Sequence, residues 1–190
     1  MRADARKNYD HLLVVAHEAV TEHGADASLR DIARKAGVGF GTLYRHFPTR
    51  EALFEALLRT RFDELTVLAR EFETSTTTAL ALVSWLREAV AVTQNYSGVI
   101  APMVAAIADP DSALHASCVA MRAAGTQLLV RAQAAHMARA DIDGTDLFGL
   151  VGALGWLGDQ PALAPRAEHL FGVISDAILT DQGRGEAGRK

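Results

Sequence analysis

Side chains that can contact nucleic acid gather on one short segment of the chain, between Phe40 and Arg50. The segment TLYRHFPTR supplies two arginines, a histidine, a tyrosine and threonine hydroxyls. Such groups donate hydrogen bonds to phosphate oxygens or to base edges, and the arginines also neutralise phosphate charge. We therefore ask which elements would hold this segment, and whether they would leave its polar and aromatic side chains exposed.

The residues just before this segment predict a short helix followed by a tight turn. Ser28 is a favourable N-cap, and Asp31 three residues later completes a pattern that resembles a capping box. Leu29, Ile32 and Ala33 recur on one face and are expected to be buried. Gly37 is expected to end the helix in the left-handed conformation.

A second short helix is predicted from about residue 40 to 46, with Leu43 buried and Phe47 at its end before Pro48. A helix of seven residues is not stable alone, so its exposed polar-aromatic face needs another explanation. A helix of this length after such a turn fits the major groove of B-DNA, with its N-terminal residues toward the bases. The pattern thus predicts a helix-turn-helix.

The run AGVGFGTLYRHFPTREALFEALL, with HLLVVAHEAVTEHG before it, resembles the helix-turn-helix signature of the tetracycline-repressor (TetR) family of bacterial transcription regulators. The resemblance covers residues 9–57, roughly a quarter of the chain. It implies an all-α, dimeric DNA-binding repressor whose C-terminal domain senses a small molecule. It also implies that Tyr44 and His46 contact backbone phosphates and that Thr42 lies at the groove.

This chain departs from the family pattern at three positions. Arg50 stands where the family usually has a phosphate-binding lysine. Gly39 replaces the usual serine cap, and Gly41 is the second glycine of the segment. Glycine at 39 and 41 lets the backbone approach DNA closely but removes two side chains that would read bases. The expected DNA-contacting residues are Arg2, Arg6, Lys7, Ser28, Gly39, Phe40, Gly41, Thr42, Tyr44, Arg45, His46 and Arg50.

Two of these assignments have an ordinary alternative. Phe40 is a candidate for contact with a thymine methyl group, or else a residue packed against the first helix. Arg2, Arg6 and Lys7 are expected to precede the first helix and to follow phosphates or enter the minor groove, or else to form an ordinary charged terminus. Arg45 can pair with phosphate or with a guanine edge.

The composition is that of a helical protein with one or two modest cores: of 190 residues, 49% are hydrophobic and 22% charged. The single cysteine excludes an internal disulfide. The first ten residues are polar and no apolar run has membrane-spanning length, so we expect neither a signal peptide nor a membrane partner, and a cytoplasmic location. The net charge is −4, but the first 50 residues carry eight basic and six acidic side chains. This distribution permits DNA contact through the N-terminal part.

About nine helices are expected. Besides the two short ones, they cover approximately residues 5–23, 49–72, 78–96, 99–108, 112–138, 145–157 and 166–181. Residues 1–52 are interpreted as the DNA-binding domain, residues 53–182 as a ligand-binding and dimerisation domain, and residues 183–190 as a disordered tail rich in glycine and basic residues.

A ligand cavity is expected among the helices between residues 49 and 138, because bulky adaptable side chains occur there with few charges. Core packing is the alternative for each residue taken alone. The effector would be uncharged and partly apolar. The candidate lining residues are Phe62, Leu65, Trp85, Asn95, Tyr96, Met103, Ile107, Cys118 and Met121.

A homodimer is expected, because one recognition helix makes too few base contacts and a two-fold dimer reads a palindrome. The last two predicted helices carry apolar stripes, and Gly149, Gly152 and Gly155 would allow close approach of a partner helix. An intramolecular core is the alternative. The candidate interface residues are Leu147, Leu150, Val151, Leu154, Leu170, Val173, Ile174, Ala177 and Ile178.

Other classes of protein fit less well. His17 and His23 are six residues apart, so they do not share a helix face as a zinc-binding H-E-x-x-H requires. His115 and Cys118 have no second pair of ligands nearby in sequence. We therefore expect no enzyme activity, cofactor or metal. A DNA-binding protein that is ligand-independent, or regulated by a protein partner, is the remaining alternative.

Overall fold

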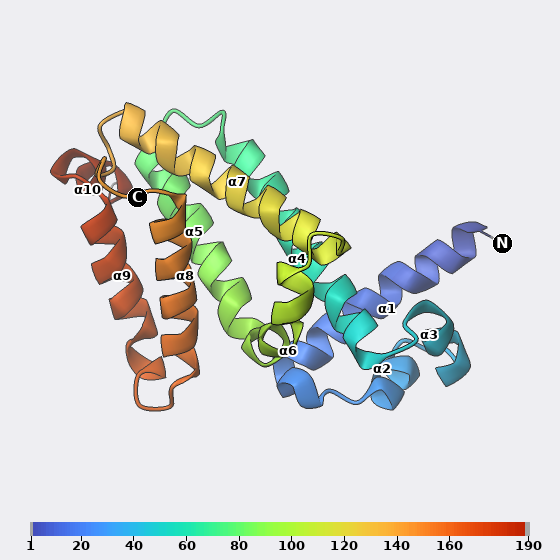
Figure 1. Cartoon of the computed structure of the whole chain (residues 1–190). Coiled ribbons are helices and arrows are strands. Elements are labelled where there is room, and N and C mark those ends of the chain that lie inside the picture. Colours follow the sequence, from blue (N-terminus) through green and yellow to red (C-terminus); the bar gives the residue numbers. More distant parts are fainter. Residues whose placement is uncertain (1, 189–190) are drawn as a thin grey trace. The chain divides into compact units, whose positions relative to one another are not determined.

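The computed structural model describes residues 2–188, and the side chains of residues 2–5 and 97 are not described. The chain is all-helical over this range, apart from an isolated antiparallel bridge between Ala138 and Leu179. The expected fold class is therefore confirmed (Figure 1). The α-helices are α1 (Arg2–His23), α2 (Leu29–Lys35), α3 (Phe40–His46), α4 (Arg50–Phe72), α5 (Thr78–Asn95), α6 (Ser97–Ala108), α7 (Ala113–Ala134), α8 (Gly144–Asp159), α9 (Ala167–Ile178) and α10 (Asp181–Ala187). Two 3₁₀ turns, η1 (Gly24–Asp26) and η2 (Ala164–Arg166), complete the list.

The chain divides into two compact units. Unit 1 comprises Met1–Arg61 and Asn95–Ala116, and unit 2 comprises Phe62–Gln94 and Ser117–Lys190. Unit 1 thus includes α6 as well as the first three helices, which a single boundary at residue 52 does not anticipate.

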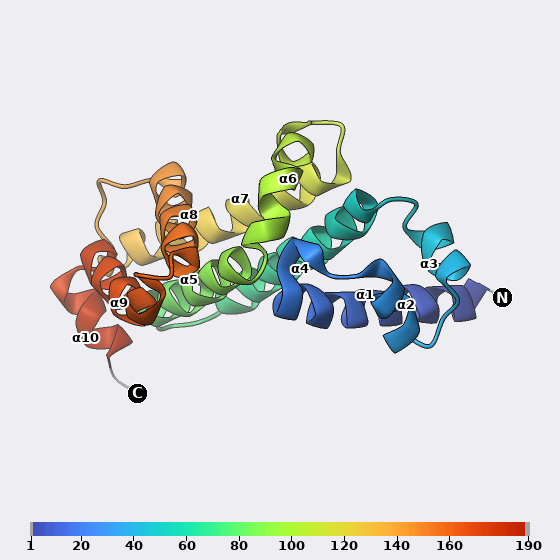
Figure 2. The same cartoon turned by 90° about the horizontal axis from the view of Figure 1, so that it is seen from below.

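In unit 1, α1, α2 and α3 enclose a small apolar core (Figure 2). Every third or fourth residue of α1 is apolar, as a helix with one buried face requires. α6 joins this unit through its N-terminal end: the Tyr96 ring stacks on His17 at 5.7 Å, and its hydroxyl is hydrogen-bonded to the His17 Nδ1 atom. The core includes Leu12, Ala16, Val20, Ile32 and Leu43.

In unit 2, the core is built around Trp85 of α5, which is 0% exposed. Its Nε1 atom donates to the Leu65 carbonyl oxygen at 2.8 Å, so the one polar atom of the indole is satisfied. The ring lies edge-on to Phe148, with centroids 5.9 Å apart. A Cβ added at Gly125 would lie 2.3 Å from the indole, so this glycine makes room for the tryptophan.

Two helices end earlier than their sequence predicts. α7 was expected to reach residue 138 but ends at Ala134, because His136 adopts φ of 58° and the Met137 amide returns to the Ala132 carbonyl at 2.8 Å. α9 was expected to reach residue 181 but ends at Ile178, whose carbonyl accepts from the Arg139 amide at 2.9 Å. In both cases a tertiary or capping bond replaces the helical one.

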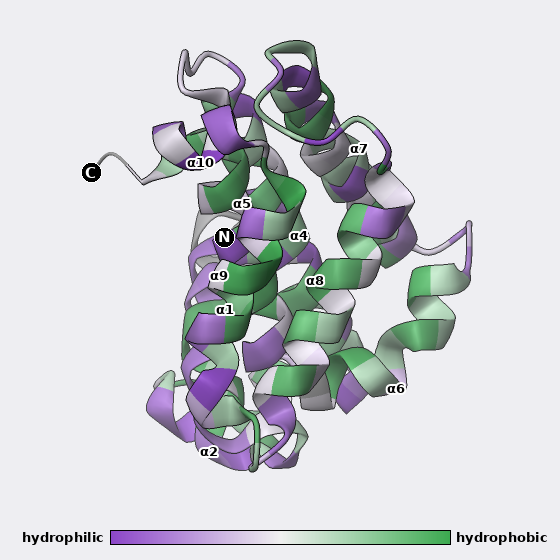
Figure 3. Cartoon of the chain, turned by 90° about the vertical axis from the view of Figure 1, so that its left-hand side faces the viewer, coloured by the Kyte–Doolittle hydropathy of each residue, from purple (hydrophilic) through white to green (hydrophobic). Residues whose placement is uncertain are grey.

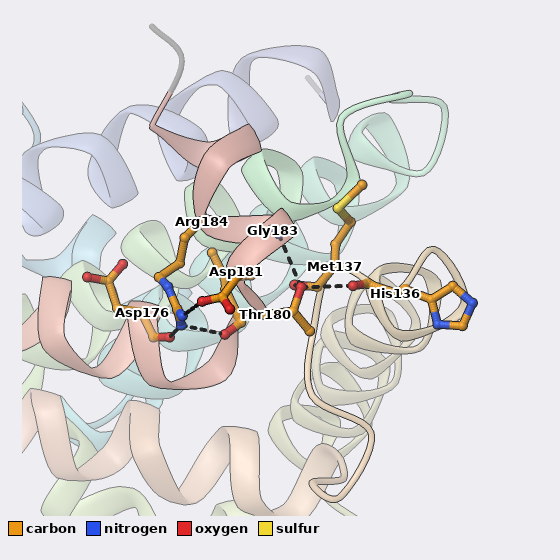
Figure 4. A network of polar contacts seen from close by, with 8 residues as sticks. His136, Met137, Asp176, Thr180, Asp181, Gly183 and Arg184 are labelled. Carbon is orange, nitrogen blue, oxygen red and sulfur yellow. Dashed lines mark hydrogen bonds and ion pairs between the residues drawn. The ribbon is translucent and has the colours of Figure 1, made fainter.

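The expectation of a disordered tail from residue 183 is wrong for residues 183–187, which belong to α10 (Figure 4). Thr180 caps this helix by accepting from the Gly183 amide at 3.1 Å, and its hydroxyl donates to the His136 carbonyl at 2.8 Å. A Cβ at Gly183 would lie 2.0 Å from the Met137 carbonyl oxygen, so only glycine allows this approach. Glu186 accepts from the Ala79 amide at 2.7 Å and thereby caps α5.

Within the described range, no single helix is both long and apolar enough to cross a membrane, and only α5 and α6 taken together as a bent pair pass that test. The same residues hold no cluster of three or more histidine, cysteine or acidic side chains suited to a metal ion.

Candidate nucleic-acid interface

The turn between α2 and α3 is fixed by local hydrogen bonds. Ser28 accepts from the Asp31 amide at 3.3 Å, which confirms the predicted N-cap. Gly37 has φ of 65°, its amide donates to the Arg34 carbonyl at 3.1 Å, and the Val38 amide donates to Ala33 at 3.0 Å. This pair of bonds is a Schellman motif, which confirms the predicted left-handed end of α2.

The buried side of α3 holds the helix against unit 1. Leu43 is 0% exposed, and Phe47 at the C-cap is also buried. Four other residues of the helix face solvent: Phe40 is 37% exposed and Tyr44 45% exposed, and Gly41 and Arg45 are exposed as well. The helix therefore presents an outer face, made of Phe40, Gly41, Tyr44 and Arg45, that we call the α3 face.

The two aromatic rings of the α3 face support each other. Phe40 and Tyr44 lie edge to face with centroids 4.9 Å apart, and the Arg30 guanidinium lies 5.5 Å above the Phe40 ring. These two ring contacts of Phe40 come from α2 and α3, and the choice between a base contact and a packing role stays a prediction. Positioned this way, Phe40 is available for an apolar contact from outside.

Arg45 lies along its own helix. Its Nε donates to the Gly41 carbonyl at 3.3 Å, and an Nη donates to the Thr42 hydroxyl at 3.2 Å. Thr42 is half-buried, so its hydroxyl sits at the margin of the α3 face. These bonds hold the guanidinium along the surface of α3.

His46 and Arg50 are held more deeply than the other candidates. The His46 ring lies 5.8 Å from that of Tyr9, which also packs against Phe47 at 5.1 Å. Arg50 donates to the Ala25 carbonyl, and its guanidinium lies 5.9 Å from the Phe54 ring centroid. Both side chains are half-buried. Tyr9 was not among the residues expected near this surface, and its one signal in the sequence is its position at the start of the apolar stripe of α1.

The N-terminal basic residues do not form an extension before the first helix. α1 begins at Arg2, three residues earlier than expected, because no glycine or proline interrupts a helix before Tyr9. Arg6 and Lys7 are therefore exposed residues within α1. The side chain of Arg2 lies outside the described residues.

The candidate ligand-lining residues fall into both units. In unit 2, Phe62, Leu65, Trp85, Cys118 and Met121 are buried, and burial raises the pKa of the Cys118 thiol. In unit 1, Tyr96 and Met103 are buried, Ile107 is half-buried and Asn95 is exposed. Their role as ligand contacts stays a prediction.

Unit 2 also contains a pocket that the sequence did not indicate, about 190 Å³ in volume, between α5 and α9. Across it, Arg87 donates to Glu168 at 2.6 Å and lies 4.3 Å from the Phe171 ring centroid. Its lining residues are Arg87, Val90, Ala91, Gln94, Ala167, Glu168 and Phe171.

The candidate dimer residues also separate into two sets. Leu147, Val151, Leu154 and Ile178 are buried within unit 2, so they already serve its own core. Leu150, Leu170 and Ile174 are half-buried, whereas Val173 and Ala177 are exposed. α8 and α9 lie side by side in both views (Figures 1 and 2).

The helical fold and the α2–turn–α3 geometry define a helix-turn-helix protein. Residues 12–57 match the model of the bacterial regulatory proteins of the tetR family, and residues 77–178 match that of the C-terminal domain of SbtR-like transcriptional regulators. The chain therefore belongs to the TetR family of transcriptional regulators, with a helix-turn-helix DNA-binding domain.

Two solved structures of TetR-family regulators resemble this fold over more than 90% of the chain. The TetR transcriptional regulator SCO0520 from Streptomyces coelicolor is 33% identical with a TM-score of 0.73, over 91% of this chain and 99% of that one. A TetR regulatory protein from Mycobacterium vanbaalenii is 29% identical with a TM-score of 0.68, over 94% and 99%.

A curated relative matches over a shorter stretch. The HTH-type transcriptional regulator SAR0097 of Staphylococcus aureus (strain MRSA252) is 37% identical over 67 residues, which are 34% of this chain and 35% of the relative. The match thus spans about a third of that relative's length.

Proposed function

We propose that this regulator binds a palindromic operator as a homodimer, represses transcription there, and is released when a small molecule binds its C-terminal part. Residues 1–52 would contact DNA, and residues 53–182 would bind the effector and the second subunit. The observation that carries the DNA-binding part is the α3 face: two aromatic rings and Arg45 are exposed on a helix held by Leu43, and Arg30 of α2 lies over the Phe40 ring.

Some residues of the α3 face would contact phosphates, and others would contact bases. Arg45 and the Tyr44 hydroxyl suit phosphate oxygens, which position the protein without selecting a sequence. Phe40 suits a thymine methyl group in the major groove. His46 and Arg50, which are bound to residues of unit 1, would contact phosphate at the margin of the face.

In vitro selection of bound duplexes tests this proposal. The expected result is a palindrome whose half-sites lie about one helical turn apart, because two α3 helices related by a two-fold axis enter successive major grooves. An enriched site without two-fold symmetry, or no enrichment at low salt, would contradict it.

The effector part needs a separate test. A compound that binds the folded chain raises its unfolding temperature by mass action, and an inducer must also bind the DNA-free state better than the DNA-bound state. A thermal-shift screen followed by operator binding with each hit measures both. Hits that stabilise the protein without weakening operator binding would favour the ligand-independent alternative.

A further inference from the structure

The pocket between α5 and α9, which we call the α5–α9 pocket, combines an apolar lining with polar ends. The α5 residues that line it lie at helical spacing i, i+3, i+4 and i+7, so one face of the helix forms one wall: Arg87, Val90, Ala91 and Gln94. The opposite wall comes from α9, which carries both polar and apolar residues (Figure 3). Val90 and Phe171 are buried and supply its apolar part. The pocket includes none of the residues that were expected to line a ligand cavity.

Arg87 is held in a defined orientation at one end of the pocket. Its guanidinium lies 4.3 Å from the Phe171 ring centroid, and its Nη1 atom donates to the Glu168 carboxylate at 2.6 Å. A guanidinium has five N–H donors in one plane. Since the bond to Glu168 uses one Nη atom, further donors of Arg87 are available to a second carboxylate.

Glu168 occupies the position that a ligand carboxylate would take. It belongs to the first turn of α9, 81 residues from Arg87 in sequence, and its side chain is 77% exposed. Exposed ion pairs contribute little to stability, because solvent screens the charges and the side chains lose freedom. A carboxylate that binds a guanidinium through both oxygens forms a stronger contact than a single bond, so a ligand can displace Glu168.

Gln94 forms the other end of the pocket, about 10 Å from Arg87 along the α5 axis. Its Nε2 atom donates to the Leu154 carbonyl oxygen at 3.4 Å, so its Oε1 atom can accept a bond from a ligand. Gly158 allows this orientation, because a Cβ there would lie 2.5 Å from the Gln94 Nε2 atom. The two ends of the pocket therefore offer a cation and a neutral acceptor.

We infer that the α5–α9 pocket binds a small carboxylic acid that carries a hydroxyl group at its far end. The carboxylate replaces Glu168 on Arg87, and the hydroxyl donates to Gln94. The apolar body of the acid lies on Val90 and Phe171. The inference rests on the proposed effector-binding role of the C-terminal part, for which it names a site and a ligand class.

The size and charge of the pocket define this class. A volume of about 190 Å³ is smaller than that of pockets for drug-sized ligands, so it suits one ring with a short side chain. The cationic Arg87 favours an anion, whereas the composition of the helices had favoured an uncharged effector.

The pocket stays open in the proposed homodimer. Val173 and Ala177, the exposed candidate interface residues of α9, lie more than about 90° around the helix from Glu168 and Phe171. A partner subunit that packs on the first pair therefore does not cover the second.

Titration of para-hydroxyphenylacetate into the full-length protein tests the inference, with ligand-observed NMR and thermal unfolding as readouts. Arg87→Gln is expected to weaken binding about 10- to 100-fold, the range for a hydrogen bond to a charged group. Glu168→Gln is expected to strengthen binding by up to about fivefold, because the competing carboxylate is removed. Arg122→Gln is the matched control, since it removes another exposed arginine of unit 2 that lies over a ring, at 5.1 Å from Phe148.

Two related compounds separate the ends of the ligand. The amide para-hydroxyphenylacetamide lacks the charge, and should bind the wild type as weakly as the acid binds Arg87→Gln. Phenylacetate lacks the hydroxyl and should bind the wild type several-fold more weakly than the hydroxy acid. Gln94→Met removes the acceptor, so it should bind both acids with equal affinity.

Three results would overturn the inference. They are no saturable binding of the acid at up to about 10 mM, an affinity that Arg87→Gln leaves unchanged, or weaker binding to Glu168→Gln. Circular dichroism confirms that each variant is folded, and if Arg87→Gln does not fold, the sign of the Glu168→Gln effect decides. Operator binding in the presence of the acid is a separate readout. An acid that binds with the expected variant pattern but leaves operator affinity unchanged would support the site and contradict its role as the effector.

Discussion

The outer faces of α3 and α8 both expose aromatic rings, yet their surroundings differ. On α3, the Phe40 ring lies under the Arg30 guanidinium of α2 and packs against Tyr44, and the exposed Arg45 belongs to the same helix. On α8, the exposed Trp156 lies at helical spacing from three small exposed residues, Gly149, Gly152 and Ala153. Exposed apolar area alone therefore does not indicate which partner covers it. The charge around it does, because cations suit a polyanion whereas a neutral stripe of small and large residues suits another helix.

The sharpest way to break this comparison is to remove the residue that holds α3. Leu43→Ala deletes a fully buried side chain, and such deletions cost about 2–5 kcal/mol of folding free energy. We expect operator binding to be lost while the dimer persists, because α8 lies in the other unit. Urea unfolding and light scattering measure the two effects, with exposed Val14→Ala as a near-neutral control. Equal loss of dimer and operator binding would contradict the separation of the two faces.

Salt concentration should affect operator binding by α3 much more than association of the subunits. Operator affinity is expected to fall roughly a thousandfold between 50 and 200 mM salt, the change that about six phosphate contacts produce. Dimer dissociation should change little, since the candidate interface residues of α8 and α9 carry no charge. Fluorescence anisotropy with labelled operator gives the salt slope, and Arg45→Gln should reduce it by about 1 for each subunit. An unchanged slope would remove Arg45 from the phosphate contacts.

Within the α3 face, two substitutions should separate base reading from phosphate contact. Phe40→Ala is expected to lose about 1 kcal/mol of discrimination at one operator position, the lower end of a single mismatch. Tyr44→Phe is expected to weaken binding to all sequences alike, because it removes one hydroxyl bond to phosphate. Binding to a panel of single-base operator variants measures both. If Phe40→Ala changed the affinity for every operator variant by the same factor, Phe40 would have a packing role and not a base contact.

The smallest effect concerns the start of α8. The Asp143 carboxylate accepts from the Asp146 and Thr145 amides at 3.1 and 2.6 Å, and these bonds lower its pKa. The cap's stabilisation is therefore fully present above the usual carboxyl pKa of about 4, and is lost as the pH falls through the lowered folded-state value. Asp143→Asn should lower Tm only slightly at neutral pH, by about 1 °C, because asparagine still caps the helix and only the charge is lost.

Thermal unfolding of wild type and Asp143→Asn across the acid range checks the sign. The difference in Tm between the two proteins should shrink as the pH falls below about 4. A difference that is independent of pH would show that the charge of the cap is unimportant. Asp141 is unsuitable for this comparison, because its own pKa is held at about 2 by the hydrogen bond from Arg139.

Features set by neighbours in sequence were predictable. Ser28, Gly37 and Leu43 fix the α2–turn–α3 geometry through bonds and packing that span a few residues, so their roles follow from residue type and spacing. The exposure of Phe40 and Tyr44 was predictable in the same way, because both lie on the seven-residue helix in which Leu43 takes the buried position.

Features that depend on contacts between residues distant in sequence were not predictable. The tail was expected to be disordered because it is rich in glycine and charge, but Gly183 fits against Met137 and Glu186 caps α5, more than a hundred residues away in sequence. α8 is apolar all round, so its periodicity could not tell which leucines and glycines face inward. Tertiary packing decided that Leu147, Val151 and Gly155 serve unit 2 while Gly149, Gly152 and Trp156 remain open, because burial depends on which helices approach and not on composition.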